Sequence, residues 1–209
     1  MHKNWIFLFT IFFPISVFSQ VRLQKPEMYI GVNGGVTGSM VMFSPSVDQG
    51  YLLGKNAGIV FRYIAEKNVG MQAELNFSQR GWKESSGLFT KQLNYIELPF
   101  MTHIYMGKTS RFFINMGPKI SYLISENNLV DGTANSTEIQ QITAIQNRFD
   151  YGLCGGFGLL FNIKKSVLQL DARVYYALSD IYSNDKRDYF DTSNNAYVSV
   201  NLAWLIRVK

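Results

Sequence analysis

Cysteine and long apolar segments are scarce in this chain of 209 residues. The single cysteine, Cys154, cannot form an intramolecular disulfide, which disfavours a disulfide-stapled secreted domain. Beyond the N-terminal segment no run of eighteen or more apolar residues occurs, so a membrane-spanning helix is not expected. The net charge of +5 comes without any long run of lysine and arginine, and therefore does not indicate a nucleic-acid-binding protein.

The first residues have the composition of a secretory signal peptide. Lys3 supplies a positive charge, residues 5–15 form a largely apolar core, and residues 17–19 fit the small-x-small pattern before a cleavage site. We therefore predict that residues 1–19 form a signal peptide, that cleavage precedes Gln20, and that residues 20–209 form one domain.

Residues 94–106 alternate between two kinds of side chain. A period of two predicts a β-strand with two different faces. One set is mostly apolar, and the other carries a carboxylate, an imidazole and two phenols. A soluble sandwich would bury the apolar face, whereas a membrane barrel would turn it toward lipid. The apolar set is Ile96, Leu98, Phe100, Thr102, Ile104 and Met106, and the other is Tyr95, Glu97, Pro99, Met101, His103 and Tyr105.

Seven further stretches alternate in the same way. Long polar loops follow the first, third, fifth and seventh stretches, and tight turns follow the second, fourth and sixth. Outer-membrane barrels show this asymmetry, which a soluble barrel of the lipocalin type has no reason to keep. We predict an all-β, eight-stranded antiparallel up-and-down transmembrane β-barrel with both ends in the periplasm. Its expected strands are residues 28–42, 53–65, 69–82, 94–106, 111–124, 148–162, 167–181 and 196–209.

Four segments carry a resemblance to a known family. They are residues 30–35 (Ile-Gly-Val-Asn-Gly-Gly), 95–100 (Tyr-Ile-Glu-Leu-Pro-Phe), 117–119 (Gly-Pro-Lys) and 151–158 (Tyr-Gly-Leu-Cys-Gly-Gly-Phe-Gly). These segments resemble the PorT-like outer-membrane β-barrel proteins of Bacteroidota. The resemblance covers the whole mature chain and implies a barrel fold in the outer membrane. The namesake of the family is tied to protein secretion and gliding machinery.

Nine ionisable side chains share the parity that would face the interior of the barrel. The interior of an eight-stranded barrel is just wide enough for its side chains, and unpaired buried charge is costly. We therefore predict a structural network of paired, hydrogen-bonded charges that plugs the lumen. A proton or ion path, or a small ligand site, is the alternative interpretation. The nine residues are Arg62, Glu74, Arg80, Glu97, His103, Lys119, Asp150, Asp171 and Arg173.

Catalytic and metal sites are not indicated. With the signal peptide removed, His103 is the only histidine, and it would lie in the periplasmic half of the barrel. A lipid-acting serine–histidine site needs its histidine near the outer leaflet. The last loop contains Asp185, Asp188 and Asp191, but their spacing matches no calcium loop. We expect no catalytic, cofactor-binding or metal-binding residues, and no enzyme.

The function predicted from the sequence is structural or interactive. The expected contact surface consists of the outer loops, residues 43–52, 83–91, 125–147 and 182–195. The expected partners are outer-membrane lipid and lipopolysaccharide, with other envelope proteins as further candidates. The chain is expected to be a monomer that binds no nucleic acid. Two alternatives stay open, namely an accessory part of a secretion or gliding machine and a lumen-binding or lipid-modifying barrel enzyme.

The assignment of the two faces predicts the effect of adding a charge. Leu75→Arg and Leu170→Arg should each destabilise the barrel by about 2–4 kcal/mol, because they place a cation in lipid near the midplane. Gln72→Arg should be milder, because Gln72 has the inward parity. The free energy of unfolding in lipid vesicles measures all three effects. Equal tolerance at the three positions would overturn the assignment.

Overall fold

The computed structural model describes residues 22–108, 110–130, 141, 143–183 and 189–208. The predicted signal peptide, residues 1–19, and the cleavage site before Gln20 lie outside these ranges and stay predictions. None of the helical structure in the described ranges is long and apolar enough to cross a membrane.

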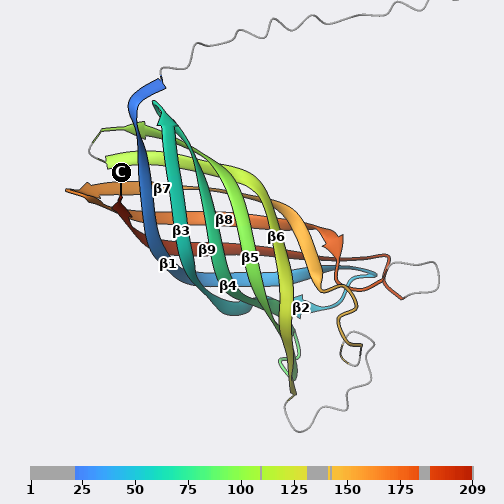
Figure 1. The fold of residues 1–209 in the computed structure, drawn as a ribbon. Coiled ribbons are helices and arrows are strands. Elements are labelled where there is room, and N and C mark those ends of the chain that lie inside the picture. Colours follow the sequence, from blue (N-terminus) through green and yellow to red (C-terminus); the bar gives the residue numbers. More distant parts are fainter. Residues whose placement is uncertain (1–21, 109, 131–140, 142, 184–188, 209) are drawn as a thin grey trace, which may run out of the picture.

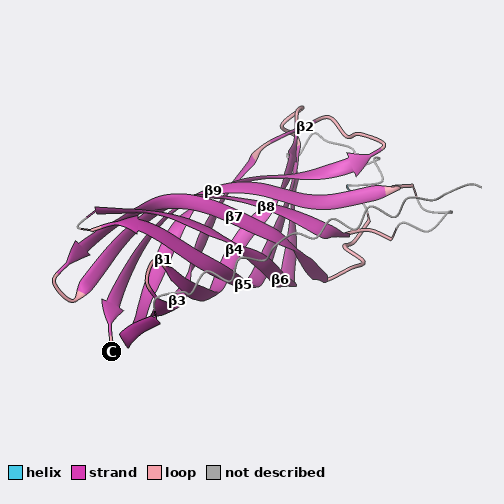
Figure 2. Cartoon of the chain, turned by 90° about the horizontal axis from the view of Figure 1, so that it is seen from above, coloured by secondary structure: helices cyan, strands magenta, loops and turns pink. Residues whose placement is uncertain are grey.

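Eight long strands form a closed antiparallel ring, which confirms the predicted fold (Figures 1 and 2). Each ring strand pairs with its neighbours in the sequence, and pairing between β1 and β9 closes the ring. A two-residue strand, β2, adds to the end of β4. The strands are β1 (Arg22–Ser44), β2 (Gln49–Gly50), β3 (Leu52–Glu66), β4 (Val69–Glu84), β5 (Phe89–Gly107), β6 (Ser110–Val130), β7 (Phe149–Ile163), β8 (Ser166–Asp180) and β9 (Thr192–Arg207).

The two ends of the barrel differ. At one end, which we term the turn end, tight turns join β3 to β4 and β7 to β8, and β5 and β6 also meet there. Asn68 and Lys164 adopt positive φ values of 70° and 54°, as tight hairpins require. The start of β1 and the end of β9 lie at this same end (Figure 1). The opposite end, termed the loop end, carries the four longer connections predicted from the sequence.

Alternation along the strands places apolar side chains outside and polar side chains inside, as predicted. On β5, Leu98 is 46% exposed, whereas its neighbour Glu97 is 3% exposed. Bulky apolar side chains cover the outside of all eight ring strands. Exposed aromatic residues lie near both ends of the strands: Phe112, Phe161 and Trp204 toward the turns, and Tyr122, Tyr151 and Tyr176 toward the loops.

Two strands extend farther toward the loop end than predicted. β5 begins at Phe89 and β6 ends at Val130, and these two residues pair across the ladder. The register shifts by one residue between Asn94 and Tyr95, where β6 carries Ile124 as an extra residue. This bulge lets both strands continue past the expected boundary, so the predicted loops at residues 83–91 and 125–147 are shorter. Residues 131–140 and 142 of the latter lie outside the described ranges.

One prediction from the sequence changes with the structure. Leu75 and Leu170 face outward, each 44% exposed, as the test of charge in lipid requires. Gln72 is fully buried in the lumen, and its Oε1 accepts hydrogen bonds from Arg62. Gln72→Arg would place a second guanidinium against Arg62, so a mild effect is no longer expected.

Glycines allow close contact between strands at selected points in the wall. A Cβ atom added to Gly158 would overlap the backbone carbonyl oxygen of Leu170 on β8. Gly155 lies on the same strand but faces outward, and a Cβ atom added there would lie 3.8 Å from its nearest neighbour. The inward glycine is therefore needed for close strand packing, while the outward glycine leaves open space.

Candidate functional site

The lumen is filled in three layers. An apolar cluster closes each end, and polar side chains occupy the space between the two clusters. The loop-end cluster, which we term the lid, contains Val41, Phe43, Trp82, Phe89, Leu93, Tyr95, Leu123, Ile145, Ile181, Tyr182 and Phe190. The turn-end cluster contains Tyr29, Val60, Ile64, Tyr105, Phe113, Leu160, Val167, Ala203 and Leu205.

Beneath the lid, four buried charges form the upper network. Arg80 lies between two carboxylates, with Nη1 at 2.9 Å from Oδ2 of Asp150 and Nη2 at 3.3 Å from Oε1 of Glu97. The Nζ of Lys119 lies 3.2 Å from the same Glu97 oxygen. Two cations therefore face two carboxylates, and the upper network has no net charge.

Tyrosines complete the upper network. Tyr197 accepts a hydrogen bond from Lys119 at 2.8 Å and donates one to Glu97 at 3.0 Å. Tyr175 donates a hydrogen bond to Asp150 at 2.9 Å, and its ring centroid lies 3.2 Å from Nζ of Lys119. Rings stacked against cations provide further stabilisation where water is excluded.

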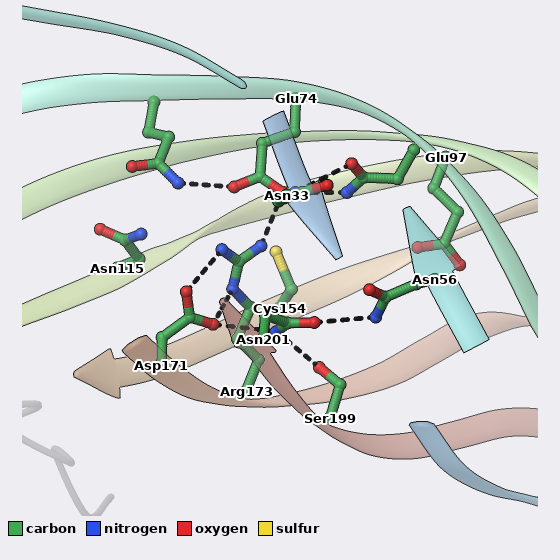
Figure 3. Close-up of polar contacts among 12 residues, drawn as sticks. Asn33, Asn56, Glu74, Glu97, Asn115, Cys154, Asp171, Arg173, Ser199 and Asn201 are labelled. Atoms are coloured by element: carbon green, nitrogen blue, oxygen red, sulfur yellow. Dashed lines mark hydrogen bonds and ion pairs between the residues drawn. The ribbon is translucent and has the colours of Figure 1, made fainter. Parts of the chain in front are cut away.

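Nearer the turn end, Arg173 bridges two carboxylates in the lower network (Figure 3). Its Nη1 donates a hydrogen bond to Oε2 of Glu74 at 2.7 Å, and its Nε donates to Oδ1 of Asp171 at 2.7 Å. Its Nη2 also donates to Oδ2 of Asp171 at 3.0 Å, which makes the contact bidentate. Such charge-assisted, bidentate contacts fix geometry strongly.

Amide side chains that sequence reasoning did not single out surround the lower network. Asn33 and Asn76 donate hydrogen bonds to Glu74 at 3.0 and 2.9 Å. Asn201 and Gln169 donate to Asp171 at 2.9 and 2.6 Å. These amides share the inward parity with the charges, which is the signal that could have identified them. They saturate acceptor positions that a single arginine leaves unfilled.

Arg62 departs from the predicted pairing. Its Nε and Nη2 donate to Oε1 of Gln72 at 2.9 and 2.7 Å, and Nη2 also donates to Gln169. Across the described ranges no carboxylate lies within ion-pair distance of Arg62. Arg62 therefore has hydrogen-bond partners but no direct ionic partner. The lower network is balanced as a group, because the two cations Arg62 and Arg173 oppose the two carboxylates of Glu74 and Asp171.

His103 is isolated from both networks. It is fully buried in the turn half of the barrel, where its Nδ1 lies 2.7 Å from Oδ1 of Asn115. The rings of Tyr105 and Phe113 pack against it at centroid distances of 5.6 and 5.2 Å. Lipid has no access to this imidazole, which argues against the lipid-modifying alternative. Cys154 is also buried, and its Sγ donates to the carbonyl oxygen of Gly117 at 3.4 Å.

Parts of the loops predicted to be free contact surfaces form the lid instead. Phe43 packs against Trp82 and Phe190 with ring centroids 5.2 and 4.8 Å apart. Tyr182, from the connection after β8, donates a hydrogen bond to the carbonyl oxygen of Thr143 at 3.3 Å. Burial, and secondarily the carboxylate of Glu126, raises the pKa of this hydroxyl, which therefore stays protonated as a donor.

Polar contacts tie the third connection to strands β4 and β5. The Nζ of Lys91, a buried residue of β5, donates to the carbonyl oxygen of Thr143 and lies 3.7 Å from Oε2 of Glu126. Gln141 donates to Glu84 at 2.9 Å.

The space between the two networks is small. A cavity of about 20 Å³ lies between the two networks, lined by residues that include Glu97, Lys119, Cys154, Arg173 and Tyr197. This volume holds about one water molecule. Within the described ranges, no group of three acidic, histidine or cysteine side chains is placed to hold a metal ion. The acidic residues Asp185 and Asp188 lie outside those ranges.

Sequence comparison identifies the family. Residues 18–183 match the family described as outer membrane protein beta-barrel domain. The chain belongs to this family. It is therefore an outer-membrane β-barrel protein. No curated protein matches it by sequence.

Two solved structures share the fold. Neisserial surface protein A aligns with a TM-score of 0.52 at 12% identity, covering 88% of this chain and 99% of the other. The outer-membrane protein OprG from Pseudomonas aeruginosa aligns with a TM-score of 0.51 at 8% identity, covering 90% and 96%. At such low identity these similarities establish the fold alone.

The lower network predicts a large effect of removing its central cation. Arg173→Met should destabilise the barrel by about 3–5 kcal/mol, because Glu74 and Asp171 would remain buried without their cation. The matched control is Arg207→Met at the turn end, where Arg207 lies 3.2 Å from Glu27 and is 44% exposed; its loss should cost less than about 1 kcal/mol. Urea unfolding in lipid vesicles measures both. Equal costs would contradict the network's structural role.

Proposed function

We propose that this protein is a closed outer-membrane barrel that works as a monomeric anchored interaction module, without enzymatic activity. The loop end would face the cell surface and the turn end the periplasm, as the distribution of short turns and long loops favours. The observation that carries the proposal is the filled lumen. Two charge-balanced networks lie between apolar clusters at both ends, and the cavity between them holds about one water molecule.

The loop end supplies the surface for interaction. A groove of about 300 Å³ lies between the first, second and fourth connections, lined by residues that include Pro45, Asp48, Glu84 and Tyr189. Tyr189 of this lining exposes 55% of its surface, and Tyr51, at the end of the first connection, exposes 68%. Exposed tyrosines are enriched at protein interfaces. Because the connections are tied to the lid, they would present this surface with little ordering cost on binding.

A narrower version follows from the resemblance to PorT-like proteins of Bacteroidota. The partner at the loop end, or at the turn end, would then belong to a secretion or gliding machine. Affinity purification after cross-linking in whole cells tests this version. Absence of a stable envelope partner would count against it, while leaving the closed, anchored barrel unaffected.

Orientation is the first testable element of the proposal. The only native cysteine is buried, so an introduced cysteine can be labelled selectively. In intact cells, a membrane-impermeant maleimide should label Tyr189→Cys at the loop end. It should label Lys164→Cys at the turn end only after the outer membrane is permeabilised. The opposite pattern would reverse the orientation and remove the loop end as a cell-surface contact site.

A further inference from the structure

The outer wall of the barrel contains a groove that the lumen and the lid leave unexplained. Its volume is about 620 Å³, and nearly all of its lining is apolar. The side chains that form it point away from the lumen: Val36, Val174, Val198 and Val200 each expose more than half of their surface. Phe157 and Met116 extend the lining farther along the wall.

The strand register explains the position of the groove. Two adjacent cross-strand rows run from β3 through β1, β9, β8 and β7 to β6, over about 24 Å at the usual strand spacing. The first row is Lys55, Val36, Val200, Ala172, Phe157 and Ile114, and the second is Leu53, Gly38, Val198, Val174, Gly155 and Met116.

Small residues hollow these rows. Gly38, Gly155 and Ala172 stand where neighbouring outward positions carry valine or phenylalanine. A Cβ on Gly38 or Gly155 would find no atom closer than 3.7 Å. These glycines are therefore not required by strand packing, and their effect is to leave a channel open to the lipid.

A single lysine stands at the start of the first row. Away from the strand ends, Lys55 is the only charged side chain that the described strand residues turn outward. Its side chain forms no hydrogen bond or ion pair with the other described residues. It precedes Glu66 by eleven residues. At about 3.3 Å per residue and a tilt of about 40°, Lys55 lies roughly 28 Å above the turns.

That height marks the outer edge of the apolar band, which is about 25 Å tall in such barrels. On the adjacent strand β4, the outward series Met71, Ala73, Leu75 and Phe77 changes to a polar residue at Gln79, eleven residues after Asn68. An ammonium group at this level reaches lipid headgroups, while the groove beside it lies in the hydrocarbon layer.

We infer that the groove holds one acyl chain of a phosphorylated outer-leaflet lipid of the lipopolysaccharide class, with Lys55 contacting its phosphate. The inference rests on the proposed orientation, which puts Lys55 in the outer leaflet. The apolar lining matches the chain, and Lys55, which pairs with Val36 of the lining, matches the headgroup. A second protein copy fits less well, because packing over Lys55 would bury its charge without a partner.

Titration of the purified, delipidated barrel in detergent tests the groove. The probes are lipopolysaccharide and the same lipid after enzymatic dephosphorylation, and native mass spectrometry counts the bound lipid. The wild type should retain one equivalent of the phosphorylated form. Lys55→Gln should weaken binding of that form by roughly fivefold, as expected for one lysine at an anionic surface, and should not affect the dephosphorylated form.

Filling the groove should remove binding of both forms. Gly155→Leu places a side chain in the channel, and Gly38→Leu serves the same purpose if the first variant does not fold. The control for Lys55→Gln is Lys83→Gln, which changes an outward lysine that belongs to neither row. The control for the glycine variants is Gly34→Leu, which changes an outward glycine that does not line the groove. A Cβ atom added to Gly34 would lie 3.7 Å from its nearest neighbour. Both controls should bind like the wild type. A mobility shift on boiling verifies that each variant is folded.

Two results would overturn the inference. Unchanged lipid binding in both Lys55→Gln and the groove-filling variants would show that the lipid binds at another place or associates with the barrel without a specific site. A doubled mass that Gly155→Leu abolishes would assign the groove to a second copy of the chain. The titration in detergent does not depend on orientation, and the cysteine labelling does not depend on lipid. Failure of the groove and failure of the proposed function are therefore distinguishable.

Discussion

The closed hydrogen-bond ladder is the constraint on which the rest of the structure depends. Hydrocarbon offers no partner for backbone N–H and C=O groups, so a sheet can cross it only when every edge is paired. Pairing of β1 with β9 removes the last edge. Closure with eight strands then fixes a narrow interior and an apolar exterior. Everything polar must be placed inside that interior or at its two ends.

The interior meets this constraint because its buried cations and carboxylates form two networks, each with no net charge. The upper network balances Arg80 and Lys119 against Glu97 and Asp150, with tyrosines filling the gaps. The lower network relies on Arg173 and a shell of amides. Arg62 has amide partners alone, so the balance is kept by the group and not by each pair. A lumen filled and balanced in this way leaves contact with other molecules to the outer surfaces of the barrel.

The alternation of side chains predicted the strands, their two faces and the inward charges, because a period of two is a local property of the chain. The bulge at Ile124 was not predictable, since it appears only when β5 and β6 are paired. The lid combines Phe43 at the end of β1, Trp82 near the end of β4 and Phe190 from the connection after β8. The groove depends on register across six strands, which brings Gly38 and Gly155 into one row. Each of these features depends on contacts between residues far apart in the chain, and such contacts cannot be read from the local pattern of a single sequence.

The central claim is that the lumen is shut. Single-channel recording in a planar lipid bilayer tests it most directly, with insertion verified by the mobility shift of the recovered protein on boiling. The account predicts a silent membrane after insertion, because ions meet two apolar clusters and two charge-balanced networks in series. Sustained stepwise conductance from the inserted wild-type protein would contradict it, and would show a water-filled path through the barrel.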